Sequence, residues 1–193
     1  MERSKKMVLL CHCILNANSK VEGLSRFQGA IGEVVTLLIE KGIGMIQLPC
    51  PELLNHGIKR WGQVKSQFDT PYYRESCQQL FKPYLHQLKD YMKNGYEIVG
   101  LVGINGSPTC GINRTCDGVW GGEWKTSDVW KEKIDTIEVK YEKGVFIEEI
   151  QELLKLNNIE LPLYGLDESC LEESIKGLRL FIEMEESSLS NNK

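Results

Sequence analysis

The chain has 193 residues, of which 41% are hydrophobic and 26% are charged, and its net charge at pH 7 is −4. These values are typical of one soluble globular domain with a sizeable core. An acidic chain is poorly suited to track nucleic-acid phosphates, so we expect no nucleic-acid polymer as a partner. Apolar runs are too short for a membrane span or a signal peptide, so we expect a cytoplasmic protein without a membrane partner.

Strands and helices are predicted to alternate along the chain. Short apolar runs predict strands at residues 7–11, 44–48, 96–102 and 161–165. Apolar residues at helical spacing predict helices over residues 27–42, 73–93, 145–156 and 171–184. Residues 103–142, which are rich in glycine and tryptophan, are predicted to form a long functional loop.

This alternation predicts the fold class α/β. We expect a single domain over residues 1–186, with a three-layer Rossmann-like or flavodoxin-like parallel sheet and helices on both faces. Residues 187–193 are predicted to form a mobile C-terminal tail.

The seven cysteines are the most informative residues. In a reducing cytosol they stay thiols, so their number indicates metal binding or chemistry more than disulfides. The alternative is that a free cysteine is a small buried apolar residue. We expect that role for Cys77 and Cys170, because each lies in or near a helical pattern.

Three other cysteines lie just beyond predicted strands. Cys13 follows the first strand, Cys50 the second and Cys110 the third. Ligands of an open parallel sheet collect beyond the carboxyl ends of its strands, so these thiols are candidates for one shared site. Three thiolates are one fewer than the four that normally hold an iron–sulfur cluster. The sequence contains no paired CxxC zinc motif, no P-loop and no GxGxxG.

Two further side chains near these cysteines can take part in chemistry. Glu52, in the sequence CPE, is either a general base for a water molecule or a first-turn acid favoured by the helix dipole. Ser107 offers a hydroxyl close to Cys110. A Ser-His-Asp triad is disfavoured because the GxSxG elbow is absent.

The segments CHCILN, CPE and SPTCG, in this order, resemble the three cysteine motifs of the thiouracil desulfurase (TudS) family and its related desulfidases. The resemblance covers about residues 7–166 and extends to Asp117-Gly118 and Gly144-Val145. Asn16 stands where the family has a glycine, and the loop that follows also differs. Because such loops line the pocket, the substrate stays open.

The resemblance implies a [4Fe-4S] cluster with one open iron site, held by Cys13, Cys50 and Cys110. The choice of Cys13 over Cys11 rests on the register of the motif. It also implies an enzyme in which Glu52 and Ser107 are catalytic. Its reaction would be the hydrolytic, non-redox desulfuration of a small thiocarbonyl compound, such as a thiolated nucleobase, with release of sulfide.

Several alternatives remain open from the residues alone. The same site would suit a sulfur carrier or transferase, or an iron–sulfur or metal-binding sensor without turnover. A nucleotide-binding flavodoxin-like module with incidental cysteines is a further alternative. The sequence does not fix the oligomeric state.

Some residues near the predicted site have two possible roles. His12 is a candidate proton shuttle. Cys116 could be a spare thiol or a resolving partner, but we expect it to be structural. Tryptophan side chains could stack on a planar ring and basic side chains could bind an anion, but we expect the tryptophans to anchor a long loop and the basic side chains to be solvated. They are Trp61, Trp120, Trp124, Arg60, Lys65 and Arg74.

Overall fold

The computed structural model describes residues 2–123 and 126–191. Four parallel strands form the central sheet in the spatial order β2-β1-β3-β6. The strands are β1 (Lys6–Leu10), β2 (Gly44–Gln47), β3 (Glu97–Ile104) and β6 (Leu163–Leu166). The central strands β1 and β3 are buried on both faces over most of their length, which explains their nearly continuous apolar sequences.

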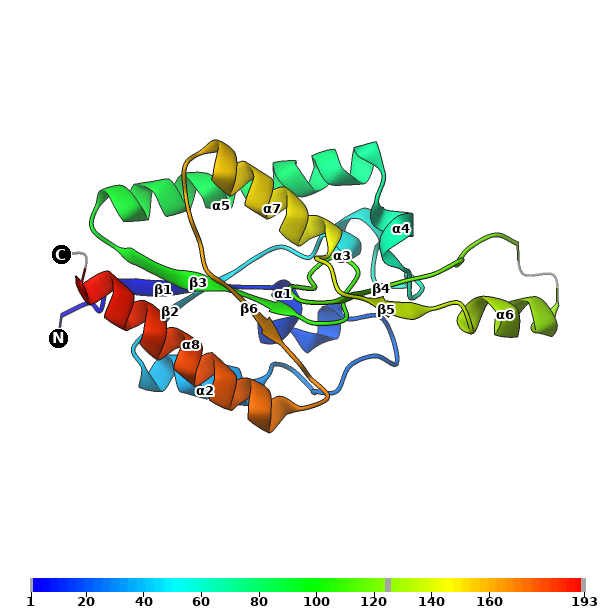
Figure 1. Cartoon of the computed structure of the whole chain (residues 1–193), viewed down its shortest axis with the longest axis horizontal. Coiled ribbons are helices and arrows are strands. Elements are labelled where there is room, and N and C mark those ends of the chain that lie inside the picture. Colours follow the sequence, from blue (N-terminus) through cyan, green and yellow to red (C-terminus); the bar gives the residue numbers. More distant parts are fainter. Residues whose placement is uncertain (1, 124–125, 192–193) are drawn as a thin grey trace.

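Helices cover both faces of this sheet and produce three layers (Figure 1). The pair α5 and α7 packs on one face, and the pair α2 and α8 lies on the other. Their bounds are Pro71–Lys93 for α5, Val145–Leu156 for α7, Gly32–Glu40 for α2 and Leu171–Asn191 for α8. The predicted single α/β domain with helices on both faces is confirmed. In the described part of the chain, no helix has the length and apolar character needed to cross a bilayer.

Two helix boundaries differ from the prediction. The first long helix begins at Gly32 rather than near residue 27. The Ser25 hydroxyl donates to the carbonyl of Phe27 and also accepts from its N–H group, and such local bonds compete with a helix. The last helix continues beyond Met184 to Asn191. The mobility of residues 187–193 stays a prediction.

The segment predicted as a long loop contains regular structure. Strand β4 (Thr115–Asp117) pairs antiparallel with β5 (Glu138–Lys140), and α6 (Ser127–Ile134) lies between them in the chain. This arm projects from one end of the molecule (Figure 1). The prediction of a plain loop was wrong because strands of three residues carry too little alternation to be recognised.

Short helices follow the carboxyl ends of β1 and β2. They are α1 (His12–Leu15), the 3-10 helix η1 (Ala17–Ser19), α3 (Pro51–His56) and α4 (Lys65–Phe68). These short helices turn the chain at this end of the sheet. Their regular backbone holds the polar side chains there in defined positions.

The N-terminus of α7 fixes the loop that follows β3. The backbone N–H groups of Val145 and Phe146 donate to the carbonyls of Pro108 and Thr109, at 3.1 and 3.0 Å. These are among the first N–H groups of the helix, which have no partner within it. Gly144 permits this close approach, since a Cβ there would overlap the backbone of Thr109.

We therefore expect Gly144→Ala to lower the free energy of unfolding by about 1–3 kcal/mol, because the added methyl group forces the loop away from the helix. Gly29→Ala is the matched control, since a Cβ at Gly29 meets nothing within 4 Å. Urea unfolding of both variants measures the difference. Equal stabilities would contradict the anchoring role of Gly144.

Candidate active site

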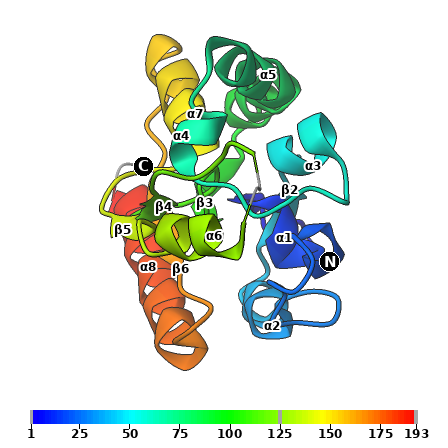
Figure 2. The ribbon, with the colours of Figure 1, turned by 90° about the vertical axis from the view of Figure 1, so that its right-hand side faces the viewer.

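A cavity of about 440 Å³ lies at the carboxyl ends of the parallel strands. In the sheet, β2 lies on one side of β1 and β3 lies on the other. The order of the strands along the chain therefore reverses between β1 and β3. Open α/β sheets bind ligands at such a switch point. Figure 2 shows the molecule from this end, where α1, α3, α4 and the arm gather.

All five site residues predicted from the sequence line this cavity. Three elements supply them: α1, the start of α3, and the loop after β3. The residues are Cys13, Cys50, Glu52, Ser107 and Cys110. Their convergence agrees with the argument from strand ends, while their chemical roles stay predictions.

Cys11 and Cys13 occupy different environments. The first strand ends at Leu10, so the chain turns into α1 instead of continuing extended through both cysteines. Cys13 lines the cavity, whereas Cys11 is fully buried in the core. This arrangement supports the choice of Cys13 as the candidate ligand.

The surroundings of the three candidate thiols disfavour the thiolate form. Burial raises the pKa of Cys13 well above its usual value, and the neighbouring Cys110 raises it further. Burial, followed by Cys110 and Glu52, raises the pKa of Cys50 to about 12. A hydrogen bond with Cys11, followed by burial, raises the pKa of Cys110. Thiolates at these positions therefore need a nearby cation.

Glu52 is held in place by two polar groups. Its carboxylate accepts a hydrogen bond from the Thr109 hydroxyl at 2.6 Å and another from Nε of Arg60 at 3.2 Å. The Ser107 hydroxyl lies 3.4 Å from that of Thr109, so the three side chains form a chain of hydrogen bonds. Arg60 is buried and also donates to the carbonyl of Ser19 at 2.7 Å. Arg60 therefore orients the carboxylate.

The loop after β3 is organised by Ser107. Its hydroxyl oxygen accepts hydrogen bonds from the N–H groups of Cys110 at 3.0 Å and Thr109 at 3.3 Å. Because the Thr109 proton is donated to Glu52, the Ser107 hydroxyl proton is directed to the oxygen of Thr109.

His12 and Cys116 also line the cavity. Nδ1 of His12 lies 3.1 Å from the carbonyl of Leu48, which can only accept, so this nitrogen carries a proton. In the neutral ring, Nε2 is then the acceptor.

Burial raises the pKa of Cys116, and Glu52 raises it further. By contrast, Cys110 raises the pKa values of Cys13 and Cys50.

The remaining cysteines give one confirmed and one wrong prediction. Cys77 is fully buried in the core, as expected for an apolar filler. Cys170 is exposed, because it lies in the polar turn that precedes α8.

The tryptophans do not form a stacking surface in this cavity within the described residues. Trp61 is 71% exposed and lies outside the lining. The indole N–H of Trp120 donates to the carbonyl of Gly62 at 2.9 Å, which ties the arm to the loop after α3. Trp124 lies outside the described residues.

Lys65 and Arg74 pair with carboxylates away from the cavity. Lys65 lies 2.6 Å from a carboxylate oxygen of Glu148, and Arg74 lies 2.7 Å from the other. Arg74 also contacts Asp69 and Glu149, each at 2.6 Å. This network joins α4 and α5 to α7. Lys65 and Arg60 are buried, so the prediction that they are solvated side chains was wrong.

Lys20, Gln63 and Glu168 are among the other side chains that line the cavity and were not predicted. Glu168 follows the fourth strand, so the argument from strand ends could have found it. Lys20 and Gln63 lie in irregular segments, where the sequence carries no comparable signal. Thr109 was also missed, although it is adjacent to Cys110.

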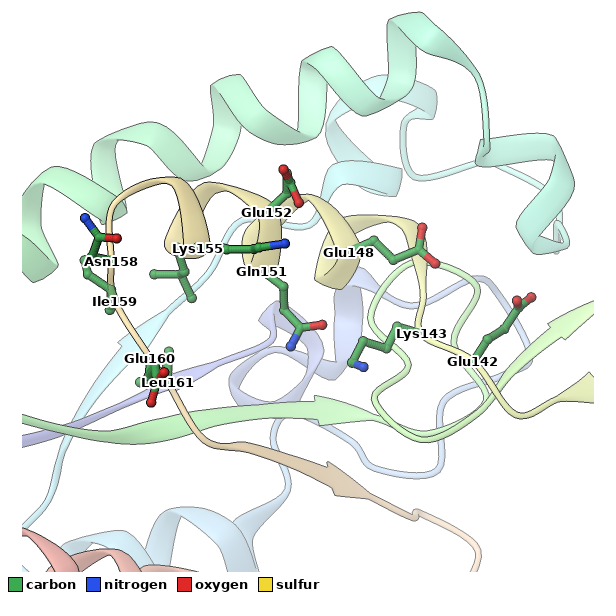
Figure 3. A pocket seen from close by; sticks show the side chains of 11 residues that line it. Glu142, Lys143, Glu148, Gln151, Glu152, Lys155, Asn158, Ile159, Glu160 and Leu161 are labelled. Atoms are coloured by element: carbon green, nitrogen blue, oxygen red, sulfur yellow. The ribbon is translucent and has the colours of Figure 1, made fainter.

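A larger hollow of about 1120 Å³ lies elsewhere, along α7 and the chain that follows it. Its charged side chains, including Glu148, Glu152 and Lys155, are spread along the helix and point in different directions (Figure 3). No cysteine lines it. The hollow therefore lacks the convergent groups of a chemical site.

In the described part of the chain, the donor atoms of the smaller cavity do not converge on one metal ion. Among the described residues, no three His, Cys, Asp or Glu side chains are placed to hold one metal ion. The thiols of Cys13, Cys50 and Cys110 are the donor type that soft metals and iron–sulfur clusters use. In a four-iron cluster each cysteine thiolate binds a different iron. The cysteine sulfur atoms therefore lie further apart than the ligands of a single metal ion do.

The fold and the cavity define a class of protein, a single α/β domain with several thiols at the switch point of a parallel sheet. The chain is similar to the uncharacterized protein MJ0003 of Methanocaldococcus jannaschii, with 46% identity over 110 residues. These residues are 57% of this chain and 70% of the archaeal protein. The chain belongs to the same family as MJ0003. No model of a known protein family and no solved structure matches the chain.

The raised pKa of Cys50 predicts slow alkylation by iodoacetamide, since only the thiolate reacts. With the pKa raised from 9.0 to about 12, the thiolate fraction at pH 8 falls roughly a thousandfold. The reaction rate should therefore keep rising as the pH passes 9. Peptide mass spectrometry after timed alkylation measures it, with the exposed Cys170 as control. A rate that becomes constant near pH 9 would contradict the shift.

Proposed function

We propose that the protein is a [4Fe-4S]-dependent desulfidase. It removes sulfur hydrolytically from a small thiocarbonyl compound, such as a thiolated nucleobase, and releases sulfide. The observation that supports this most is the cavity at the switch point, in which the thiols of Cys13, Cys50 and Cys110 meet the carboxylate of Glu52. The resemblance of the cysteine motifs to the thiouracil desulfurase family suggests the reaction. A cytoplasmic location, where thiols stay reduced, is part of the same proposal.

Cys13, Cys50 and Cys110 would hold the cluster. When bound, it would supply one iron without a protein ligand, a Lewis acid with affinity for thiocarbonyl sulfur. Positive charge beside these thiols would favour the thiolate forms that burial disfavours. Loading should therefore release protons.

Glu52 would act as the general base. It would accept a proton from a water molecule whose oxygen attacks the thiocarbonyl carbon. Thr109 and Arg60 hold the carboxylate at a defined position in the cavity wall. Ser107 would turn its hydroxyl proton from Thr109 to the substrate or the intermediate and donate a hydrogen bond there.

The overall reaction is balanced without an oxidant or a reductant. A carbon–oxygen bond forms as water adds, and the carbon–sulfur bond breaks. The products are the carbonyl compound and hydrogen sulfide, which takes both protons of the water. A carboxylate base and a hydroxyl donor are therefore enough for the proton transfers.

A second candidate function follows from Cys116, which lines the same cavity. If its thiolate were a fourth ligand, the cluster would have no open iron, and a sensor without turnover would be favoured. Glu52 and Asp117 are the charged neighbours that raise the pKa of Cys116. The cysteine motifs that resemble the thiouracil desulfurase family include Cys13, Cys50 and Cys110 but not Cys116, which favours three ligands. A sulfur carrier would use the same three.

Replacing single cysteines by alanine is expected to divide them into two groups. After anaerobic reconstitution with iron and sulfide, the intact protein should contain about four irons per chain and absorb near ~400 nm. Cys13→Ala, Cys50→Ala and Cys110→Ala should lose both signals. Cys11→Ala, Cys77→Ala and Cys116→Ala should keep them. Iron analysis and visible absorption measure the outcome.

Three results of this series would contradict the proposal. Failure of the intact protein to take up iron would remove the cofactor. Loss of the cluster in Cys11→Ala with retention in Cys13→Ala would reverse the ligand assignment. Loss in Cys116→Ala would instead support a cluster with four cysteine ligands.

Glu52→Gln is expected to lower sulfide release by about 10²–10⁴-fold without changing iron content, because it removes the base and keeps the shape of the side chain. Glu152→Gln, in the larger hollow on α7, is the matched control and should retain full activity. Sulfide is measured colorimetrically with a thiolated pyrimidine as substrate. Full activity of Glu52→Gln would exclude it as the base.

A further inference from the structure

The arm formed by β4, α6 and β5 exposes apolar side chains along its last strand. Ile137, Val139 and Tyr141 are 39%, 54% and 89% exposed. Successive side chains of an extended chain alternate between two faces, so these three share one face of β5 and its flanking residues. Apolar side chains that are exposed together in this way mark an interaction surface, whereas singly scattered ones do not.

The two-stranded sheet of the arm has one open edge. In the described part of the chain, β5 is paired with no strand other than β4. The other side of β4 faces the body of the protein, where Asp117 accepts hydrogen bonds from the N–H and the hydroxyl of Ser66 at 3.2 and 2.7 Å. By contrast, β5 lies on the outer side of the arm's sheet (Figure 2). An outer strand edge presents backbone N–H and C=O groups that can pair with another strand.

The sequence of β5 is complementary to a second copy of itself. Antiparallel pairing centred on Val139 places Glu138 of each copy opposite Lys140 of the other. The same pairing places Val139 opposite Val139, and Ile137 opposite Tyr141. Opposite charges therefore face each other, and apolar side chains face each other. Such cross-strand pairs stabilise an antiparallel sheet.

The two charged residues also disfavour other arrangements. A shift of the antiparallel register by two residues places Glu138 opposite Glu138 in one direction and Lys140 opposite Lys140 in the other. A parallel pair in register would place both charges opposite their own copies. A shift by one residue would place a charged side chain opposite Val139. The charges thus select one register, which has a twofold axis at Val139.

We propose that the protein forms a symmetric dimer in which the β5 strands of two copies pair antiparallel about Val139. The two arms then form one four-stranded sheet in the order β4-β5-β5-β4, and the partner is a second copy of this chain. A strand of three residues gives a small interface, so the dimer forms weakly and reversibly. This inference rests on the arm alone and is independent of the proposed desulfidase.

Sedimentation velocity of the full chain tests the proposal over about 1–300 μM, where small interfaces associate. A reductant is included, because Cys170 is exposed and could otherwise link two chains. The measured mass should rise with concentration from 22.0 kDa toward twice that value. Glu138→Lys and Lys140→Glu each place like charges opposite one another at both ends of the pair. Each variant should therefore associate at least about tenfold more weakly.

Exchange of the charges provides the decisive comparison. An equimolar mixture of Glu138→Lys and Lys140→Glu should form a heterodimer, because two cations of one chain then face two carboxylates of the other. The double variant Glu138→Lys/Lys140→Glu should dimerise like the intact protein, since opposite charges again face each other. Glu152→Lys reverses an exposed charge on α7 and is the matched control, which should leave dimerisation unchanged.

Three outcomes would overturn the proposal. The first is an intact protein that stays monomeric over the whole concentration range. The second is dimerisation of both single variants as strong as that of the intact protein, which would place the interface elsewhere. The third is failure of the mixture to associate more strongly than either variant alone. Association of the mixture would also show that both variants fold.

Discussion

The backbone hydrogen bonds between the loop after β3 and the first turn of α7 are the contacts on which the candidate site depends. They bind the carbonyls of Pro108 and Thr109, the two residues between Ser107 and Cys110. With this segment fixed, the Thr109 hydroxyl can hold the carboxylate of Glu52, which comes from another element. One short loop therefore sets the position of a thiol, a hydroxyl and a carboxylate together. Gly144 is required because no side chain fits where helix and loop meet.

The charges around the cavity are arranged so that little positive charge is left for the thiols. Arg60 pairs with Glu52, and Lys20 pairs with Glu168. These two cations are thus already engaged, and burial raises the pKa values of Cys13 and Cys50. A site built for a free nucleophilic cysteine would lower the thiol pKa instead. The arrangement suits thiols that give up their protons when a metal centre arrives, and it argues against a cysteine nucleophile.

The sequence predicted the fold and five cavity residues because both depend on short-range patterns. Apolar runs locate the parallel strands, and polar residues just beyond them must meet at one edge. The sequence did not predict contacts that depend on distant segments. Thr109 acquires its role only when α3 brings Glu52 to it, and Gln63 is positioned by an arm that the sequence did not resolve into strands. Cys170, which was expected in the core, is exposed because it lies in the polar turn that precedes α8.

The sheet topology brings the proposed reactive centre together from three strands. Cys13 and Cys110 follow the central strands β1 and β3, whereas Cys50 and Glu52 follow the edge strand β2. Segments after central strands are enclosed by their neighbours, so the sheet itself defines the positions of Cys13 and Cys110. The segment after β2 has fewer neighbours, and Glu52 is held there by Thr109 and Arg60. The carboxylate that we propose as the base therefore depends on two side chains outside its own helix, and loss of either would move the base without moving the thiols that follow the central strands.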